Sequence, residues 1–364
     1  MTALRALVAG SVTIDTIAVI AEQDIERITM HNDAASFLLV EQGRKVQAES
    51  ISTHVGGGAA NVAVSLQRQG LASDVLGLTG VDHDAEKIRR RLADEGVGLA
   101  HLGQTAEAAT GSAIHVSAHD HDAAIFVQRG ANTLLRAPHV QAVDFSGYDL
   151  VYAASLSNES ASCFPAILEK ARAAGAFAVS NPGVRQIAAR PAELLESLHC
   201  VDLLALNSAE AAALIPHLLQ RGGLRVQHVF EAEDGAPELL VDGLRSATFR
   251  VGLPDVMSGL NDLGPGHVMV TDGANGAYLL NDNTLHYCPT RPAEVRGTAG
   301  AGDAFTSTVA AQIVAGSSAG QALMAASMNA ASVVSHVDTQ TGLLRADELA
   351  TVTKAELATQ SWPL

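Results

Sequence analysis

The sequence has few aromatic and few basic side chains. Its 364 residues include only 8 Phe, 4 Tyr and 1 Trp, and single-stranded nucleic acids are usually bound by aromatic platforms on which bases stack. The 23 Lys and Arg are outnumbered by 39 Asp and Glu, which leaves a net charge of −16. This balance argues against DNA, RNA and anionic membranes as partners. An anionic small molecule remains compatible, because a local group of backbone N–H donors can bind it.

Cysteine and long apolar runs are scarce as well. Cys163, Cys200 and Cys288 lie far apart, without metal-type spacing, and three cysteines cannot pair off fully. We therefore expect reduced, buried thiols in a cytoplasmic protein. The apolar stretch at 6–9 is too short for a signal sequence, and no window predicts a membrane span.

What the sequence does contain is alternating strand-like and helix-like segments. Apolar runs at 150–154, 177–179, 201–206 and 268–271 are separated by helix-like stretches such as 164–174, and two Ala-rich helices are expected at 304–315 and 320–336. The alternation predicts an α/β fold with a mostly parallel central sheet covered by helices on both faces. We expect residues 1–364 to form one domain.

Two stretches interrupt this alternation. Short strand-like segments within about 16–52 and 111–128 predict a small β-sheet that projects from the main body. Between its last strands, His119 to Asp122 reads either as a metal site or as a polar turn, and the turn is preferred because four adjacent residues do not easily converge on one ion. The stretch 216–265 gives no clear pattern, although 231–237 is typical of a surface loop.

The strongest chemical motif is the segment 298–305, directly before a helix. The small residues Gly300, Ala301 and Gly302 let the backbone approach a phosphate, and the free N–H groups of the first helical turn attract anions. Asp303 would then lie against the phosphate acceptor and take a hydroxyl proton, as phosphoryl transfer requires. The alternative is that Asp303 only caps the helix.

A second glycine-rich turn, at 56–58, also precedes a helix. Asn61 on the first turn of that helix is placed to hydrogen-bond a sugar hydroxyl. Taken alone, this motif is better explained as a glycine loop needed only for a sharp strand-to-helix turn.

Two further motifs follow predicted strands, where open α/β sheets bind ligands. Glu210, three residues after Asn207, is suited to hold magnesium directly or through water, or the pair forms a helix-capping pattern. Thr271, Gly273 and Gly276 are suited to lie against a nucleotide, or they form an ordinary turn before a hairpin.

The order and spacing of these motifs together resemble the ribokinase-like (PfkB) carbohydrate and nucleoside kinases. The resemblance extends over nearly the whole chain, and it includes 57–63 with Gly70 and Gly80, Gly10-Ser11 with Asp15, 80–82, 207–210, 271–276, 298–303 and 329–331.

The resemblance implies an ATP- and Mg²⁺-dependent kinase that phosphorylates a small sugar. By this resemblance Asp303 is the catalytic base, 300–302 form the anion hole and Glu210 organises the metal. The implied nucleotide-side residues are Asn207, Thr271, Gly273, Gly276 and Asn329, and the implied substrate-side residues are Asp15, Gly57, Gly58 and Asn61. The stretches 16–52 and 111–128 would be a lid that excludes water and pairs subunits into a homodimer.

The sequence departs from the family pattern at two positions. Gly297 stands where an acidic residue usually precedes the Thr of the second signature. Because that carboxylate lies near a monovalent-cation site in the family, we do not expect this chain to share the family's activation by potassium. Thr308 stands where Gly or Ala is usual, which we interpret as a packing change. No cluster of Lys or Arg predicts a second phosphate site, which favours an unphosphorylated acceptor.

Three alternative functions stay open. A nucleoside kinase would use the same chemistry, with Phe37 or Phe126 of the lid to stack on a base. A non-catalytic sugar sensor has only Gly297 in its favour. A dinucleotide-dependent oxidoreductase is less consistent, because the turn after the first strand lacks Gly-x-Gly-x-x-Gly.

Overall fold

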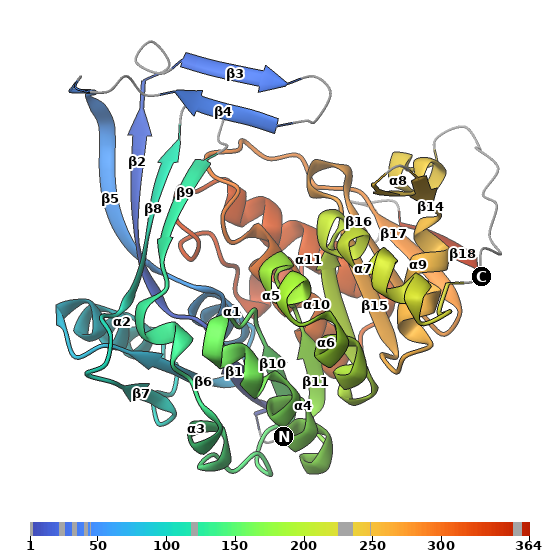
Figure 1. The fold of residues 1–364 in the computed structure, drawn as a ribbon, viewed down its shortest axis with the longest axis horizontal. Helices are drawn as coiled ribbons and strands as arrows, with labels where there is room; N and C mark the ends of the chain where they lie inside the picture. Colours follow the sequence, from blue (N-terminus) through green and yellow to red (C-terminus); the bar gives the residue numbers. More distant parts are fainter. Residues whose placement is uncertain are drawn as a thin grey trace.

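The computed structural model describes residues 3–21, 26–30, 35–39, 43, 45–117, 123–224, 236–247, 249–351 and 359–364. Its centre is a ten-stranded sheet in the order β18-β17-β16-β15-β12-β11-β10-β1-β6-β7 (Figure 1). The strands from β15 to β7 run parallel, and β16 to β18 form an antiparallel edge. The strands are β1 (Arg5–Ala9), β6 (Ala72–Thr79), β7 (Leu102–Gln104), β10 (Leu150–Ala153), β11 (Phe177–Ser180), β12 (Leu203–Asn207), β15 (His267–Thr271), β16 (Ala277–Asn281), β17 (Thr284–Cys288) and β18 (Gln360–Pro363).

Helices cover both faces of this sheet, as predicted. Successive strand residues point to opposite faces, so Ala6 and Val8 of β1 join one apolar core while Leu7 and Ala9 join the other. The first core includes α1 (Gly58–Arg68), α2 (His83–Asp94), α10 (Ala301–Val314) and α11 (Ala319–Val334). The second includes α4 (Phe164–Ala174), α5 (Val184–Ala189), α6 (Pro191–Ser197), α7 (Ser208–Gln220) and α9 (Leu253–Asn261). The short helices α3 (Ala137–Gln141) and α12 (Ala346–Leu349) lie at the periphery of this arrangement.

A separate four-stranded sheet in the order β5-β2-β8-β9 stands beside the main body (Figure 1). It consists of β2 (Thr13–Ile20), β5 (Ala48–Gly56), β8 (Gly111–Ser117) and β9 (Ala123–Gln128). The small sheet expected from these stretches is therefore present. However, β3 (Glu26–Met30) and β4 (Ala35–Leu39) pair with each other as their own two-stranded sheet.

The strand register gives this small sheet two different faces. Asp15 and His115 lie on one face, and both side chains are buried. Ile51, Ile114 and Phe126 lie on the other face, where they are 69%, 50% and 63% exposed. The face that carries Asp15 and His115 is thus covered by protein around these two residues, although Ile125 and Val127 of β9 on the same face are 52% and 49% exposed.

The region that sequence reasoning could not interpret is partly regular. The helix α7 continues through Pro216, and α8 (Glu238–Asp242), the β13–β14 hairpin (Leu244–Ser246 and Phe249–Val251) and α9 follow. Most of the surface loop expected at 231–237, and the segment 119–122, lie outside the described residues.

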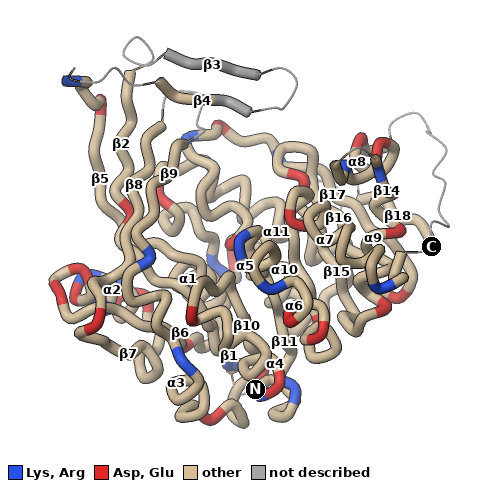
Figure 2. Tube along the Cα trace, viewed as in Figure 1, with Lys and Arg blue, Asp and Glu red and all other residues tan. Residues whose placement is uncertain are grey.

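The excess of acidic residues is spread over the surface. Figure 2 shows acidic positions on α2 and on α8, at opposite ends of the molecule. Among the described residues, no helix combines the length and the apolarity that crossing a bilayer requires.

Candidate active site

Asp303 lies in the first turn of α10, behind a glycine turn. The helix begins at Ala301 and its N-cap is Gly300, which has a left-handed φ of +80°. A Cβ on Gly300 would lie 2.7 Å from Cβ of Thr339, so both backbone conformation and packing require glycine here. Asp303 is therefore the third helical residue, and its carboxylate accepts a hydrogen bond from another helix. The interpretation of Asp303 as a mere helix cap is wrong.

The partner of Asp303 is Asn61 on α1. Nδ2 of Asn61 donates a hydrogen bond to Oδ2 of Asp303 over 2.9 Å. Burial raises the pKa of Asp303 to about 6; the hydrogen bond from Asn61 opposes this shift, and the negative charge of Asp15 adds to it. The carboxylate is thus poised to change protonation near neutral pH, which suits a group that accepts a proton.

Asp15 reaches the same region from the small sheet. Its Oδ1 accepts a hydrogen bond from the Thr13 hydroxyl over 2.7 Å, and Nε2 of His115 lies 3.7 Å from its Oδ2. A Cβ on Gly56 would lie 2.0 Å from that Oδ2. The first glycine of the 56–58 turn is therefore explained by the space that the Asp15 carboxylate occupies.

The other two glycines of this turn have different surroundings. Gly57 has a φ of +92°, and a Cβ there would lie 2.6 Å from the carbonyl oxygen of Ser11. A Cβ on Gly58 would lie 3.8 Å from Oδ1 of Asp303 and 3.4 Å from the Ala154 methyl group. Gly57 is thus required because its backbone packs closely against that of Ser11, whereas Gly58 lies beside the Asp303 carboxylate.

A cavity of about 580 Å³ opens on the other side of the α10 turn. Its lining brings together several residues that the sequence placed on the nucleotide side. These are Asn207, Thr271, Gly273 and Gly276, and they are joined by Ala301 and Gly302 of the expected anion hole. Pro289, Val295, Phe305 and Val334 supply apolar walls. A largely apolar cavity lined by a few polar groups is typical of a small-molecule or cofactor site.

Glu210 and Asn207 form a capping box at the start of α7. The Asn207 N–H donates to Glu210 Oε2 over 2.9 Å, and the Glu210 N–H donates to Asn207 Oδ1 over 2.8 Å. Burial raises the pKa of Glu210, and hydrogen bonds to the backbone N–H groups of Asn207 and Val184 oppose this rise. The capping interpretation therefore describes this structure. The described residues contain no group of three or more His, Cys, Asp or Glu suited to a metal, so a Mg²⁺ here would depend on phosphate and water oxygens besides Glu210.

Asn329 does not line the cavity. Its Nδ2 donates to Oγ1 of Thr308 over 2.8 Å, and its Oδ1 accepts from the Leu344 N–H over 2.8 Å. The same Thr308 hydroxyl accepts a hydrogen bond from Gln69 over 3.2 Å and donates to the Ala304 carbonyl. The unusual Thr308 thus joins α1, α10 and α11, and the Asn329 side chain takes part in this junction.

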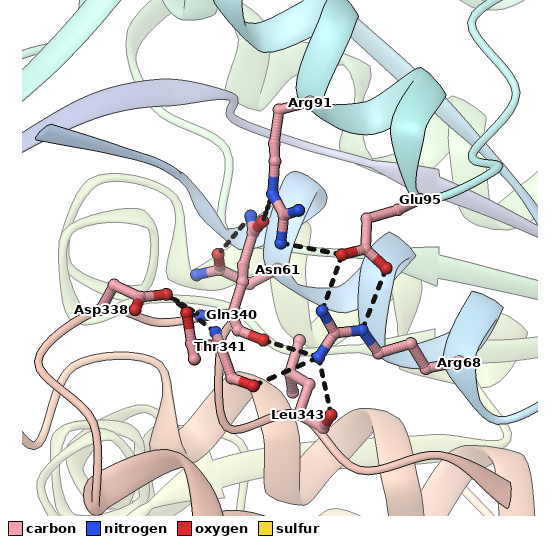
Figure 3. A network of polar contacts seen from close by, with 8 residues as sticks. All are labelled: Asn61, Arg68, Arg91, Glu95, Asp338, Gln340, Thr341 and Leu343. Atoms are coloured by element: carbon pink, nitrogen blue, oxygen red, sulfur yellow. Dashed lines mark hydrogen bonds and ion pairs between the residues drawn. The ribbon is translucent and has the colours of Figure 1, made fainter.

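Sequence reasoning missed the polar residues after α11. Thr339 and Gln340 are buried, and both donate hydrogen bonds to the Asn61 side-chain oxygen, over 2.8 and 3.3 Å. Arg68 and Glu95, which hold this segment, were missed as well (Figure 3). Their sequence surroundings carry no motif, because these contacts join positions far apart in the chain.

Two arginines qualify the expectation of an unphosphorylated acceptor. Burial and the like charge of Arg185 lower the pKa of Arg129, and no acidic partner of either side chain occurs within the described ranges. The Arg129 carbonyl oxygen lies 2.8 Å from the Cβ position of Gly111, which pairs with Thr13. Arg129 is therefore at the base of the small sheet. In contrast, the Asn132 side chain already has two partners: it accepts a hydrogen bond from the Val12 N–H and donates one to the Val12 carbonyl.

Comparison with known proteins identifies the family. The sequence matches the pfkB family carbohydrate kinases over residues 20–242 and 252–346. The chain belongs to this family. Its members are phosphotransferases that use a hydroxyl group as acceptor, as the motifs predicted.

Individual relatives of this pfkB-family chain are distant. It is 26% identical over 290 residues to the bifunctional protein HldE of Azotobacter vinelandii, a match that covers 78% of this chain and 53% of the relative. A fructokinase of Klebsiella pneumoniae is 27% identical over 298 residues, with 79% and 85% covered. The chain thus spans about half the length of the bifunctional relatives.

Solved structures agree on the fold. Arabidopsis thaliana ribokinase complexed with ribose and ATP has a TM-score of 0.69 and 20% identity, with 97% of this chain and all of that chain covered. The nucleoside kinase of Methanocaldococcus jannaschii has a TM-score of 0.70 and 19% identity, with 96% and 97% covered. At these identities the likeness shows the ribokinase fold alone.

Proposed function

We propose that this chain transfers the terminal phosphate of ATP to a hydroxyl group of a small sugar, with Asp303 as general base. The observation that carries the proposal is what surrounds Asp303. Its carboxylate accepts a hydrogen bond from Asn61 and lies near the charge of Asp15, while Ala301 and Gly302, directly before it, line the cavity. A carboxylate in this position can take the proton of an acceptor hydroxyl while the first-turn N–H groups stabilise the transferring phosphate.

The nucleotide would occupy the cavity beside Thr271, Gly273 and Gly276. Glu210 would hold a magnesium ion through phosphate and water oxygens, and the ion would neutralise charge on the phosphates. The half-buried carboxylate of Glu210 fits this role because burial, which raises its pKa, disfavours its charged form unless a cation lies nearby.

The acceptor would bind between Asp15 and Asp303. The Asp15 carboxylate is suited to accept hydrogen bonds from vicinal hydroxyls, and one N–H of the Asn61 amide remains available besides the one bound to Asp303. The four-stranded sheet would act as a lid over this acceptor, since Asp15 and His115 lie together on one of its faces.

The test is ADP release from ATP and Mg²⁺ with a panel of acceptors. Because Arg129 and Arg185 have no described acidic partner, the panel includes sugar phosphates beside ribose, fructose, adenosine and inosine. We expect Asp303→Asn to lower kcat by about 10²–10⁴-fold, since it removes the base and keeps the shape. Asp282→Asn, in an exposed turn, is the matched control. Full activity of Asp303→Asn would contradict the mechanism.

A nucleoside acceptor is the second candidate, but the lid aromatic that it invoked is poorly placed. Phe126 shares the exposed face of the small sheet with Ile114, opposite to Asp15. Stacking of Phe126 on a base bound at Asp15 of the same chain is therefore unsupported. Preferred turnover of adenosine or inosine over sugars in the same panel would reverse this ranking.

The exposed apolar face of the lid is instead suited to a homodimer. Ile51, Ile114 and Phe126 together form a surface that a second copy would cover. Multi-angle light scattering should give a mass of two chains for the wild type and of one chain for Ile114→Glu. A monomeric wild type at micromolar concentration would refute the dimer.

A further inference from the structure

Asn61 is held by contacts on both ends of its side-chain amide. The nitrogen donates to Asp303, while the oxygen accepts hydrogen bonds from the Thr339 hydroxyl and the Gln340 amide. Asn61 and its two donors are all buried: the side chains of Asn61, Thr339 and Gln340 are 4%, 6% and 2% exposed. The two donors on the oxygen therefore determine which end of the amide faces Asp303.

The direction of the Gln340 amide is itself fixed. Nε of Arg91 donates to Oε1 of Gln340 over 3.2 Å, and an arginine can only donate. The Gln340 nitrogen must then point toward Asn61. At the other end, an ionised Asp303 can only accept. The chain from Arg91 through Gln340 and Asn61 to Asp303 thus has one allowed hydrogen-bond direction.

The segment that carries these residues, residues 338–343, is called the anchor loop below. Arg68 donates from Nη1 to the carbonyl oxygens of Gln340 and Leu343 over 2.9 and 2.7 Å, and more weakly to that of Thr341 (Figure 3). Both Arg68 and Arg91 form ion pairs with Glu95, and the pKa of Glu95 is lowered mainly by its hydrogen bond to Arg68.

A second tie lies inside the anchor loop. Oδ1 of Asp338 accepts hydrogen bonds from the N–H groups of Gln340 and Thr341 over 2.9 and 2.8 Å. The loop is therefore held from α1, from α2 and by its own acidic residue, which leaves its buried side chains little freedom.

The anchor loop also contacts the phosphate-side turn. Cβ of Thr339 would be only 2.7 Å from a Cβ on Gly300, the N-cap of the Asp303 helix. One residue thus packs on the turn before Asp303 and hydrogen-bonds the side chain that holds Asp303.

We propose that Thr339 and Gln340 are positioning residues, which aim the Asn61 amide at Asp303 and so set the orientation and proton affinity of the base. The inference rests on the proposed role of Asp303. The charged groups around this chain are Asp15 beside Asp303, His54 beside Asp338, and Arg68, Arg91, Arg345 and Glu95 behind the loop.

The first experiment needs no substrate. Protein labelled with ¹³C at the Asp carboxyl carbon gives a resonance for Asp303, which is identified by its loss in Asp303→Asn. In the wild type it should titrate near pH 6. Gln340→Met and Thr339→Val keep the side-chain size but remove a donor to Asn61. Each should move the Asp303 titration upward, by roughly one unit at most, because a mobile amide stabilises the carboxylate less well.

Thr341→Val is the matched control, since it makes the same change in the anchor loop but removes a hydroxyl that bonds Asp338 and not Asn61. Its Asp303 titration should equal that of the wild type. The inference is overturned if Gln340→Met and Thr339→Val also titrate like the wild type. This outcome is distinct from failure of the proposed function, which is judged by the ADP assay on Asp303→Asn.

The second experiment is a double-mutant cycle on ADP release with D-ribose or D-fructose. Gln340→Met should lower kcat by about 10-fold with little change in KM, because the base is misaligned while the acceptor still binds. In the background of Asn61→Ala the same substitution should have no further effect. An equal loss in both backgrounds, or a loss confined to KM, would overturn the role.

Discussion

The two glycine turns that meet at Asp303 use their glycines in parallel ways, but they differ in what fills the space beside them. In each turn the left-handed glycine packs against the protein's own chain: Gly57 on Ser11, and Gly300 on Thr339. The later glycine faces the site. A Cβ on Gly58 would touch Ala154 and Asp303, whereas a Cβ on Gly302 would meet nothing within 4 Å.

This difference separates the two halves of the candidate site. On the Asn61 side the protein itself supplies the partners of the carboxylate, through the anchor loop. On the Gly302 side the space belongs to the cavity of about 580 Å³. A motif rich in glycine can therefore carry a folding requirement at one position and a binding requirement two residues later.

The largest effect should come from a substitution at a glycine that packs against the protein's own chain. Gly57→Ala combines a strained φ of +92° with a 2.6 Å approach to the Ser11 carbonyl, and we expect it to lower the free energy of unfolding by about 3 kcal/mol. Urea unfolding measures this. Gly70→Ala, with a φ of +92° but no neighbour within 4 Å, should lose less, and equal losses would show that the packing is unimportant.

A smaller, purely functional effect is expected at the open position. Gly302→Ala places a methyl group in free space at the cavity wall, so the unfolding midpoint should stay that of the wild type. Because the methyl group hinders close approach of a phosphate to the first-turn N–H groups, ATP-dependent turnover should fall about 10–100-fold. Unchanged turnover would show that the phosphate does not approach this turn.

The smallest expected effect is the gain in stability when the charged Asp303 side chain is replaced by a neutral one. The folded-state pKa of Asp303, about 6, lies above the ordinary value of 3.8 for an Asp side chain, so the fold favours the protonated form, and this contribution to stability is lost as pH rises from about 4 through 6. Asp303→Asn should therefore be more stable than the wild type at pH 8, by about 1–2 kcal/mol after allowance for its partly exposed position.

The gain in stability of Asp303→Asn should shrink as the pH is lowered toward 4. Urea unfolding at pH 8 and pH 5 measures this trend. A constant difference at both pH values would contradict the raised pKa.

The sequence sufficed to predict the parallel sheet and its helices because each buried strand is a short apolar run. The strands β3, β7, β13, β14 and β18 were not predicted. β18 contains Gln360, Ser361, Trp362 and Pro363, a composition without strand character, and it forms only by pairing with β17. Its existence depends on a partner more than seventy residues earlier, which no local pattern reveals.

The candidate site shows the same division. The motifs placed Asp303, Gly302 and Thr271 in chemically sensible positions, since each motif is local. The pairing of Asn61 with Asp303 joins residues 242 positions apart, and Thr339 and Gln340 stand in a polar segment without periodicity. Asn329 was expected on the nucleotide side from its motif alone. The motif could not show that the Asn329 side chain donates a hydrogen bond to Thr308.

The last strand gives the molecule a built-in optical label. The single tryptophan of the chain, Trp362, sits on β18 opposite Leu285 and packs on one of the two apolar cores. Intrinsic fluorescence excited at the indole band therefore reports the outer edge of the central sheet. A change in emission during a ligand titration would show that the surroundings of this edge have changed. Because Trp362 lies at this edge, constant emission would not report on events at Asp303.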